Sequence, residues 1–365
     1  MPEGRWFERS YVVNFFNKKA ASWWAEKRRY LIEELGVSGF KTDGGEHLWG
    51  RDITVTEIPQ TNSQARNLYP EKYFQSLKSL LDKDKILFSR SGYIHSPKST
   101  LFWVGDEDSE YEALEANIIA GLNVSISGNP FWGWDIAGFS GDLPEPDLYK
   151  RSCELAVFTP IFQFHSEDSG NPVPSAERSP WNISEYYKDY KIMNFYRFCA
   201  SLRMNLSPYI VQEARFCVQN NLPLTIPISL INPNLKGQKL AYYFGRDILV
   251  YPSIFENEQN QLKLPEGEWL DLWNGEWHRN EISTYGFDGE HFHSIFLKKY
   301  SVIPLSVNNS GVLGVPHWNQ EINSLLIIDD PKDFKDENLF IKKYEKEISK
   351  IKKRFQCPRT SNRLS

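Results

Sequence analysis

Cysteine is scarce in this chain of 365 residues, and long apolar runs are missing from it. The four cysteines stand far apart, form no CxxC pair and show no zinc-like clustering, which indicates reduced, mostly buried thiols. No apolar run approaches the roughly 18 residues that a membrane span needs, and the start of the chain lacks the basic-then-apolar pattern of a secretory signal. We therefore expect a soluble, cytoplasmic protein with no membrane partner.

A large excess of either charge is also lacking. The net charge of −5 gives no reason to expect nucleic acid as a partner. With 41% hydrophobic and 24% charged residues, the composition is that of an ordinary globular protein with room for one large domain and a smaller one. Aromatic residues make up 15% of the chain, and its 12 Trp and 18 Tyr suit both a large core and stacking against sugar rings. The aromatic content alone does not separate these two uses.

Up to about residue 235 the chain alternates between strand-like and helical segments. Strands are expected over residues 38–43, 86–90, 99–106, 123–128 and 161–167. Helices are expected over residues 18–35, 71–82, 109–120 and 145–158. Asn17 and Gly36 are the expected ends of the first helix, and Ser109 with Glu112 forms a capping-box pattern at the start of the third. Strands that alternate with helices predict parallel β–α units.

Beyond about residue 235 the pattern changes to alternating residues separated by Gly and Asn turns, which predicts a small antiparallel β-domain. Residues 341–365 carry nine Lys and Arg against two Glu and contain an a/d spacing that lasts two heptads. This tail is either a helix for a partner or a solvated terminal helix, and the second is the commoner outcome for such a segment.

A polar or charged residue stands at or just past the end of five successive strand-like segments. These residues are Asp43, Arg90, Asp106, Asp135 and His165. In a (β/α)8 barrel the carboxyl ends of the strands form the mouth of the active site, so residues in this phase are the expected source of catalytic groups. Any one of them taken singly is more often a cap or part of a loop ion pair, but five in phase favour a shared site.

The stretch GFKTDGGE, residues 39–46, places a carboxylate at the end of the first of these strands. Gly44 and Gly45 allow a sharp turn and a close approach to Asp43. Such a carboxylate can act as a nucleophile if a second carboxyl supplies a proton, and in retaining glycosidases the two groups lie about 5–5.5 Å apart. Asp106, in FWVGDEDS, is the candidate partner. A plain turn or a weak cation site would also account for DGGE taken alone.

Nine short motifs follow one another in a fixed order over most of residues 11–306. They are GFKTDGGE, FSRSGY, FWVGDEDS, NPFWGWDIAGFSGD, FQFHSE, SPWN, LRMNLSPYI, YYFGRDILVYP and LPEGEWLDLWNGE. Together they resemble glycoside hydrolase family 31, the family of retaining α-glucosidases and α-xylosidases. PFWGWDIAGF, in its position after WVGD, is highly specific.

The resemblance implies which residues act on the substrate. Asp43 would be the nucleophile, and Asp106 the general acid/base that first donates and then accepts a proton. Arg90 close to Asp43 would favour its ionised form. The sugar pocket would be lined by Lys41, Arg90, Trp103, Trp132, Asp135, Phe139 and His165. We expect neither a metal nor an organic cofactor.

Two positions beside the sugar pocket depart from the family pattern. Lys41 stands two residues before the nucleophile, where many α-glucosidases of the family carry Trp, and lysine there resembles the α-xylosidase branch and some others. Gln163 stands where arginine is common, two residues before His165. We expect a retaining α-glycosidase whose substrate is a short α-linked oligosaccharide, with α-glucosidase ranked before α-xylosidase.

The first residues predict an incomplete barrel. Residues 12–24 look like the family segment that follows barrel strand 3, so the expected fold is α/β: a (β/α)8 barrel lacking strands 1 and 2, followed by a small antiparallel β-domain. The expected domains are a partial barrel over 1–231, a β-domain over 232–306, and a truncated distal segment with the basic helical tail over 307–365. Two interpretations stay open. One is an active enzyme completed by the missing N-terminal segment or by a second copy of the chain, and the other is an inactive carbohydrate-binding fragment.

Overall fold

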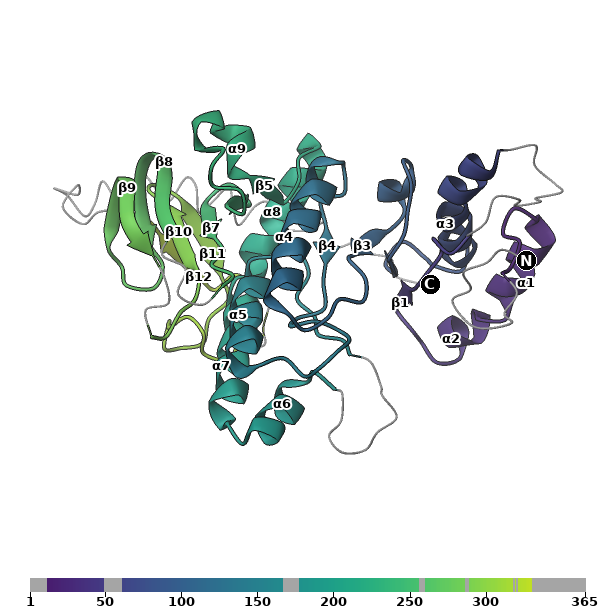
Figure 1. Ribbon diagram of the computed structural model, residues 1–365, viewed down its shortest axis with the longest axis horizontal. Helices are drawn as coiled ribbons and strands as arrows, with labels where there is room; N and C mark the ends of the chain where they lie inside the picture. The colour runs from purple at the N-terminus through teal and green to yellow at the C-terminus, as the bar shows by residue number, and fades with distance from the viewer. Residues whose placement is uncertain are drawn as a thin grey trace, which may run out of the picture.

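Parallel strands with their helices occupy one end of the molecule, and antiparallel strands occupy the other (Figure 1). The structure is a computed structural model, and it describes residues 12–48, 61–166, 177–255, 260–285, 289–317, 319 and 321–329. In the view of Figure 1, the helices α4, α5, α7 and α8 stand between these two sets of strands.

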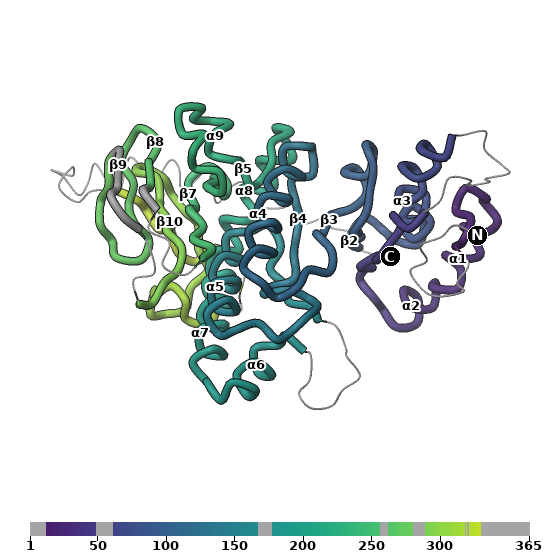
Figure 2. The backbone as a smooth tube through the Cα atoms, viewed as in Figure 1, coloured from purple at the N-terminus to yellow at the C-terminus, as the bar shows by residue number. Residues whose placement is uncertain are grey.

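The first sheet holds four parallel strands in the order β1–β2–β3–β4. They are β1 (Gly39–Thr42), β2 (Ile86–Ser89), β3 (Leu101–Trp103) and β4 (Trp132–Gly133). The pairing is parallel, with Lys41 opposite Phe88 and Phe102 opposite Trp132. The carboxyl ends of the strands therefore lie at the same edge of the sheet. Figure 2 shows β2, β3 and β4 side by side in chain order. The strands predicted over 38–43, 86–90 and 99–106 and the α/β class are confirmed, the third strand being shorter than predicted.

Helices connect these strands and continue after them. They are α1 (Lys18–Glu26), α2 (Arg29–Glu33), α3 (Asn62–Lys78), α4 (Tyr111–Ile126), α5 (Pro146–Val157), α6 (Pro180–Tyr187), α7 (Tyr190–Asn205), α8 (Ser207–Asn220) and α9 (Ile228–Ile231). The helix predicted over 145–158 is confirmed by α5, which packs on α7. No helix in the described ranges is both long and apolar enough to cross a membrane.

The helix predicted over residues 18–35 forms as two helices. Asn17 caps the first as predicted, because its Oδ1 accepts two backbone N–H groups of the first turn at 2.8 and 3.0 Å. The interruption comes where Arg28 Nη1 donates to the Trp24 carbonyl at 2.9 Å, since that carbonyl would accept the Arg28 N–H in a continuous helix. Gly36 follows the second helix with a φ of +67°, the left-handed conformation expected after a helix end.

The start predicted for the helix over 71–82 is wrong, because α3 begins at Asn62. Thr61 Oγ1 accepts the Gln64 N–H at 3.3 Å, and Gln64 Oε1 accepts the Thr61 N–H at 3.0 Å, which is a complete capping box. Pro70 lies inside the helix and removes one backbone hydrogen bond, but the helix continues through it. The capping box therefore sets the start of this helix.

The strand predicted over residues 123–128 is wrong, because α4 continues to Ile126. The buried residues of α4 recur at helical spacing and include Leu114, Ile118, Leu122 and Ser125. Ser125 Oγ lies 2.7 Å from Thr225 Oγ1, so the last turn of the helix is tied to a distant part of the chain. Tertiary packing of this face prevails over the strand preference of the β-branched residues.

Two further local predictions are wrong. Ser109 forms no capping box, and its Oγ instead accepts a hydrogen bond from Arg178 Nε at 3.2 Å. The segment predicted as a strand over 161–167 forms no strand in its described part. It still lies beside the end of the parallel sheet, because Ile136 donates its N–H to the Gln163 carbonyl at 3.1 Å.

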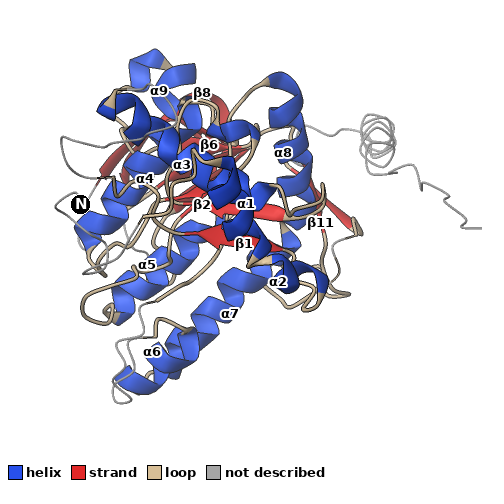
Figure 3. Ribbon diagram, turned by 90° about the vertical axis from the view of Figure 1, so that its right-hand side faces the viewer, coloured by secondary structure: helices blue, strands red, loops and turns tan. Residues whose placement is uncertain are grey.

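The remaining sheets are antiparallel, which confirms the predicted β-domain (Figure 3, strands in red). The larger sheet has the order β5–β6–β7–β10–β8–β9, and β11 pairs with β12. The strands are β5 (Thr225–Pro227), β6 (Tyr242–Phe244), β7 (Ile248–Tyr251), β8 (Asn260–Asp271), β9 (Trp277–Tyr285), β10 (Ser294–Lys298), β11 (Val302–Leu305) and β12 (Ser324–Ile327). The domain divisions after residues 231 and 306 stay predictions, and the basic segment 341–365 lies outside the described residues.

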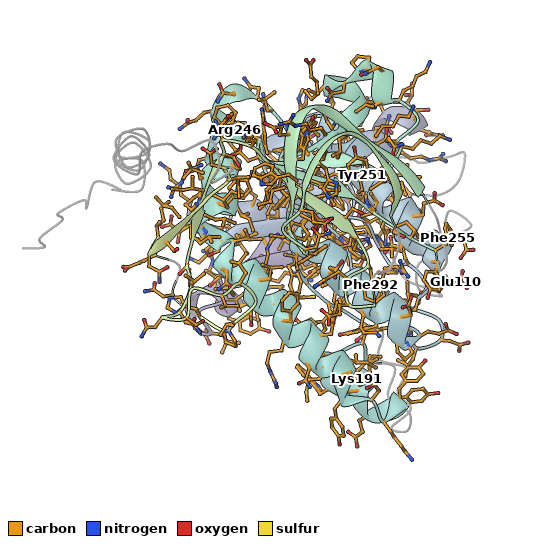
Figure 4. All side chains as sticks on the ribbon, turned by 90° about the vertical axis from the view of Figure 1, so that its left-hand side faces the viewer. Glu110, Lys191, Arg246, Tyr251, Phe255 and Phe292 are labelled. Carbon is orange, nitrogen blue, oxygen red and sulfur yellow. The ribbon has the colours of Figure 1, made fainter. Side chains whose placement is uncertain are left out.

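One hydrophobic core joins the helices to the antiparallel sheet, running from α4, α5, α7 and α8 into β6, β7 and β10. Glu154 of α5 is fully buried and accepts the backbone N–H groups of Phe292 at 2.9 Å and His293 at 2.8 Å. Arg246, in the turn after β6, forms a two-point ion pair with Glu213 of α8 at 2.6 and 2.8 Å. Figure 4 labels Phe292 and Arg246. These contacts fix the sheet against the helices.

Gly121→Val in α4 should destabilise the protein. A Cβ on Gly121 would lie 2.4 Å from ring atoms of Trp132, which is buried. Overpacking of this kind costs about 1–3 kcal/mol, and we expect a loss of that size in the free energy of unfolding measured by urea titration. Gly237→Val is the matched control, because no atom lies within 4 Å of its Cβ position, and it should change stability by less than about 0.5 kcal/mol. Equal stability of the two variants would contradict the packing.

Candidate active site

Five of the predicted site residues lie at the carboxyl-terminal edge of the parallel sheet. Asp43 directly follows β1, Arg90 directly follows β2, and Trp103 ends β3. Asp106 and Asp135 follow β3 and β4 within three residues. Their side chains form one cluster, because parallel strands end at the same edge of their sheet.

Arg90 is the centre of this cluster. Its Nη1 lies 2.9 Å from Asp43 Oδ1 and 2.8 Å from Asp106 Oδ2, and its Nη2 lies 2.6 Å from Glu46 Oε1. His47 Nε2 accepts a further hydrogen bond from Arg90 Nη2 at 2.9 Å. Because both aspartate oxygens lie within 3 Å of one nitrogen, they are less than about 6 Å apart, in line with the roughly 5–5.5 Å between the carboxyl groups of retaining glycosidases.

Opposing influences act on the protonation of Asp43. Burial raises the pKa of its carboxyl, the Arg90 guanidinium lowers it, and the Asp106 carboxylate raises it again, so that the net direction is upward. The Asp43 side chain remains 43% exposed, and its Oδ1 accepts the Gly44 N–H at 2.8 Å. Burial lowers the pKa of Arg90, but the carboxylates led by Glu46 outweigh this and raise it above its ordinary value. Arg90 is therefore a permanent cation.

Gly44 and Gly45 shape the turn that follows Asp43. Both adopt the left-handed conformation, with φ of +69° and +97°. A Cβ on Gly45 would also lie 2.6 Å from Ser91 Oγ and 3.1 Å from Tyr73 Cδ1. Ser91 Oγ in turn donates to the Gly44 carbonyl at 2.6 Å. Both the backbone conformation and the neighbouring side chains thus require glycine in this turn.

A second group of contacts surrounds Lys41. Its Nζ donates to Asp135 Oδ1 at 3.2 Å and to His165 Nδ1 at 3.3 Å. The same nitrogen lies 3.8 Å from the centre of the Trp103 ring, within the range of a cation–π contact. Asp135 is fully buried, and its Oδ1 also accepts from Gln163 Nε2 at 2.9 Å. These residues form a second polar cluster beside Arg90 and its carboxylate partners.

Phe139 and Trp132 lie in different surroundings. The Phe139 ring packs 4.9 Å from the His165 ring, and the His165 side chain is 48% exposed. Trp132 is buried in the core, where its Nε1 donates to Thr225 Oγ1 at 2.9 Å and its ring faces Gly121 of α4. Alternate residues of a strand face opposite sides, and Trp132 takes the side away from the cluster. The structure therefore brings together all the predicted site residues except Trp132.

Two acidic residues that the sequence prediction omits also belong to the cluster. Glu46 Oε1 accepts from Arg90 Nη2 at 2.6 Å and from Arg90 Nε at 2.9 Å. Glu107 follows Asp106 directly, and burial raises its pKa to about 8, with the Asp135 carboxylate adding to the rise. Signals for both were present, since Glu46 closes the motif DGGE and Glu107 stands between two aspartates in GDED.

Carboxyl groups outnumber permanent cations in the cluster. The carboxyl groups belong to Asp43, Glu46, Asp106 and Asp135, and the cations are Lys41 and Arg90. Glu107 is not counted, because its raised pKa favours the neutral acid at neutral pH. Such an excess favours a positive charge that develops between these groups during a reaction. Over the described residues, no group of three or more His, Cys, Asp or Glu side chains is arranged to hold a metal ion.

Two family models match the chain one after the other. Residues 1–213 match the glycosyl hydrolases family 31 TIM-barrel domain, and residues 222–308 match the glycosyl hydrolase family 31 C-terminal domain. The chain belongs to glycosyl hydrolase family 31. The predicted resemblance is confirmed, and the parallel sheet of this family 31 chain is part of a TIM barrel that an antiparallel β-domain follows.

The relatives of this family 31 chain are longer than it is. It is 38% identical over 318 residues to an isomaltosyltransferase of Sporosarcina globispora, which covers 84% of this chain and 29% of that protein. It is 36% identical over 280 residues to a 1,3-alpha-isomaltosidase of Kribbella flavida, and this match covers 75% of this chain and 39% of that protein. A solved cycloalternan-degrading enzyme from Trueperella pyogenes, in complex with a covalent intermediate, matches with a TM-score of 0.73 and 35% identity over 78% of this chain and 40% of that one. The chain thus spans two fifths or less of each.

Arg90→Met should destabilise the protein at neutral pH. The Arg90 side chain is 12% exposed and is the shared counter-ion of Asp43, Glu46 and Asp106. Because these carboxylates are about a third or more exposed, water screens their repulsion, and the loss should be about 1–3 kcal/mol rather than the 3–5 kcal/mol of a fully buried pair. The loss should shrink at low pH, where the carboxylates become protonated.

Urea titrations near pH 7 and pH 4 measure this difference. Arg29→Met is the matched control, because Arg29 also bridges two acids, Glu26 and Glu33, but on an exposed helix surface. It should leave stability nearly unchanged at both pH values. If Arg90→Met lost as much at pH 4 as at pH 7, the packing of the side chain rather than its charge would be responsible.

Proposed function

We propose that the protein is a retaining α-glycosidase in which Asp43 is the nucleophile and Asp106 is the general acid/base. The observation that carries the proposal is the contact of both carboxylates with one nitrogen, Arg90 Nη1, at 2.9 and 2.8 Å. The two nearest carboxylate oxygens are therefore less than about 6 Å apart, which favours the roughly 5–5.5 Å carboxyl separation of a retaining enzyme over the roughly 6.5–9.5 Å of an inverting one. The family supports the reaction class, and the Trueperella pyogenes relative was solved with a covalent intermediate.

In the first step Asp43 attacks the anomeric carbon while Asp106 donates a proton to the departing oxygen. The bond from the anomeric carbon to that oxygen breaks, and an ester between Asp43 and the sugar forms. Arg90 supports this step because it favours the ionised form of Asp43 against the effect of burial. In the second step Asp106 takes a proton from an incoming hydroxyl, which displaces Asp43 and restores the original anomeric configuration.

The surroundings of the two carboxylates fit an oxocarbenium-like transition state. The excess of carboxyl groups stabilises its positive charge. Asp135 and His165 hydrogen-bond to sugar hydroxyls in this proposal, and Lys41 holds both of them, at 3.2 and 3.3 Å. Trp103 and Phe139 supply flat apolar surfaces for the sugar ring. The pocket therefore binds the sugar by its hydroxyls and ring faces.

The substrate that we propose is an α-linked glucose oligosaccharide containing isomaltosyl units. The support comes from the relatives, an isomaltosyltransferase at 38% identity and a 1,3-alpha-isomaltosidase at 36%. An isomaltosyl unit consists of two α-linked glucoses, so we rank α-glucosidase activity before α-xylosidase activity. Hydrolysis and transfer share the ester on Asp43 and differ only in whether water or a sugar hydroxyl accepts the glycosyl group.

Asp43→Asn should abolish cleavage of α-glucosides, because an amide cannot form the glycosyl ester. Azide should then restore release of activated aryl α-glucosides, since a small anion can occupy the place of the lost carboxylate. The product should be the azide of opposite anomeric configuration, identified by NMR. Near-normal turnover of an ordinary substrate by this variant would refute the assignment.

The companion variant Asp106→Asn separates the two roles. Substrates with poor leaving groups should lose about 10²–10⁴-fold in turnover, whereas aryl glucosides of acidic phenols should keep a fast first step. An equal loss on both types of substrate would remove Asp106 from the role of acid. If the unaltered chain binds oligosaccharides but turns none over, a carbohydrate-binding role replaces the enzymatic one.

Lys41→Trp should change the preference between glucosides and xylosides. The variant replaces a cation that holds Asp135 and His165 by an apolar ring, so the sugar hydroxyls lose an aligned hydrogen-bonding group. We expect the ratio of kcat/KM for an aryl α-glucoside and an aryl α-xyloside to change by about tenfold or more. Lys85→Trp, immediately before β2 and thus at its other end, is the control and should leave the ratio unchanged. An unchanged ratio in Lys41→Trp would contradict the expected role.

A further inference from the structure

Arg178 is bonded to two loops of the candidate site. It stands two residues before α6, it is fully buried, and its backbone carbonyl accepts the Tyr149 hydroxyl of α5 at 3.0 Å. Its Nε donates to Ser109 Oγ, in the loop after β3, at 3.2 Å. Its Nη2 donates to three consecutive carbonyl oxygens in the loop after β4, those of residues 140–142, at 2.7, 2.9 and 3.1 Å. One buried guanidinium therefore holds both loops.

These two loops carry residues proposed for the reaction. Asp106 lies in the first loop, three residues before Ser109, and Phe139 lies in the second, directly before the three carbonyls. The loops also bond to each other, because the Glu107 carbonyl accepts the backbone N–H groups of Phe139 at 2.7 Å and Ser140 at 3.0 Å. A residue that fixes this junction thus fixes the backbone on which the proposed acid/base and one wall of the sugar pocket stand.

The junction is closely packed. Gly138 has a φ of +93°, and a Cβ there would lie 2.8 Å from the Asp108 carbonyl oxygen and from backbone atoms of Ser109. Gly141 has a φ of +75°, in the same left-handed region, and its carbonyl converges with the two beside it on Arg178 Nη2. Carbonyl dipoles that point at one place repel each other, so this loop conformation needs a cation among them. Arg178 supplies that cation.

We propose that Arg178 is a positioning residue that places Asp106 and Phe139 through the two loops. Asp106 lies in a segment held on both sides, since the Val104 N–H donates to the Gly133 carbonyl at 3.1 Å before it and Arg178 holds the loop after it. A general acid must lie within hydrogen-bond reach of the departing oxygen, and a displacement of about 1 Å is enough to slow a reaction strongly. The positioning role rests on the proposed function, whereas the junction itself does not.

Hydrogen–deuterium exchange followed by mass spectrometry tests the junction without turnover. In Arg178→Lys the charge remains, but a single ammonium cannot reach Ser109 and the three carbonyls at once as the planar guanidinium does. The backbone amides in peptides covering residues 106–110 and 137–142 should therefore exchange about tenfold faster or more than in the unaltered chain.

Arg203→Lys is the matched control, because Arg203 of α7 also donates to three carbonyl groups. They belong to Val157 at 2.8 Å and to Thr159 and Pro160 at 2.6 Å each. This variant should speed exchange only around those residues and leave the peptides covering 106–110 and 137–142 unchanged.

Turnover tests the positioning role. Arg178→Lys should lower the turnover of an α-glucoside with a poor leaving group by about tenfold or more relative to that of an aryl α-glucoside of an acidic phenol, because a displaced Asp106 delivers its proton less well. A loss of folded protein would lower both rates by the same factor. Arg203→Lys should leave the ratio of the two rates unchanged.

Unchanged exchange in both loops of Arg178→Lys, or an unchanged ratio of the two rates, would overturn the proposal. If exchange rises but the unaltered chain cleaves no glycoside, the proposed function fails and the junction stands. If Arg178→Lys does not fold, Ser109→Ala decides, because it keeps the arginine and removes only its contact with the loop after β3. That variant should speed exchange over residues 106–110 and shift the ratio in the same direction, and no change in either would refute the role.

Discussion

A single guanidinium makes the carboxylate cluster possible. Arg90 contacts Asp43, Glu46 and Asp106, and β2, which it follows, lies between the two strands that carry these acids. Without a cation among them, three carboxylates this close together would repel each other. Among these three strands, the middle one carries the cation and its two neighbours carry the acids that contact it. The order of the strands therefore places Arg90 between its carboxylate partners.

Trp103 connects the two polar groups of the site. Lys41 Nζ lies 3.8 Å from the centre of its ring, and Arg90 Cζ lies 5.7 Å from the same point. The indole is itself fixed, because it is buried and its Nε1 donates to the Thr42 carbonyl at 3.3 Å. The Trp103 ring thus contacts both Arg90, which binds the proposed reacting carboxylates, and Lys41, which binds Asp135. The residues proposed for the chemical step and those proposed for sugar binding are therefore positioned by the same side chain.

The positions of the main site residues could be predicted from the sequence, because parallel strands end together whatever their exact length. Asp43, Arg90 and Asp106 needed only the order of the strands. The side of the sheet on which a residue lies could not be predicted in the same way, since a strand of two residues gives no alternation to read, and the burial of Trp132 against α4 follows only from the packing of the fold. The helical state of residues 123–126 depends on packing against Thr225, which local preferences do not contain.

The two polar partners of Lys41 lie 94 and 124 residues further along the chain. Contacts between such distant residues close large loops, so they form late in folding, after the local helices and hairpins. Until then the acids of the site remain hydrated and their repulsion is weak. The electrostatic cost of the cluster consequently arises only when the sheet is already assembled. A ligand that recognises this cluster would therefore bind the native state and not the unfolded or partly folded chain.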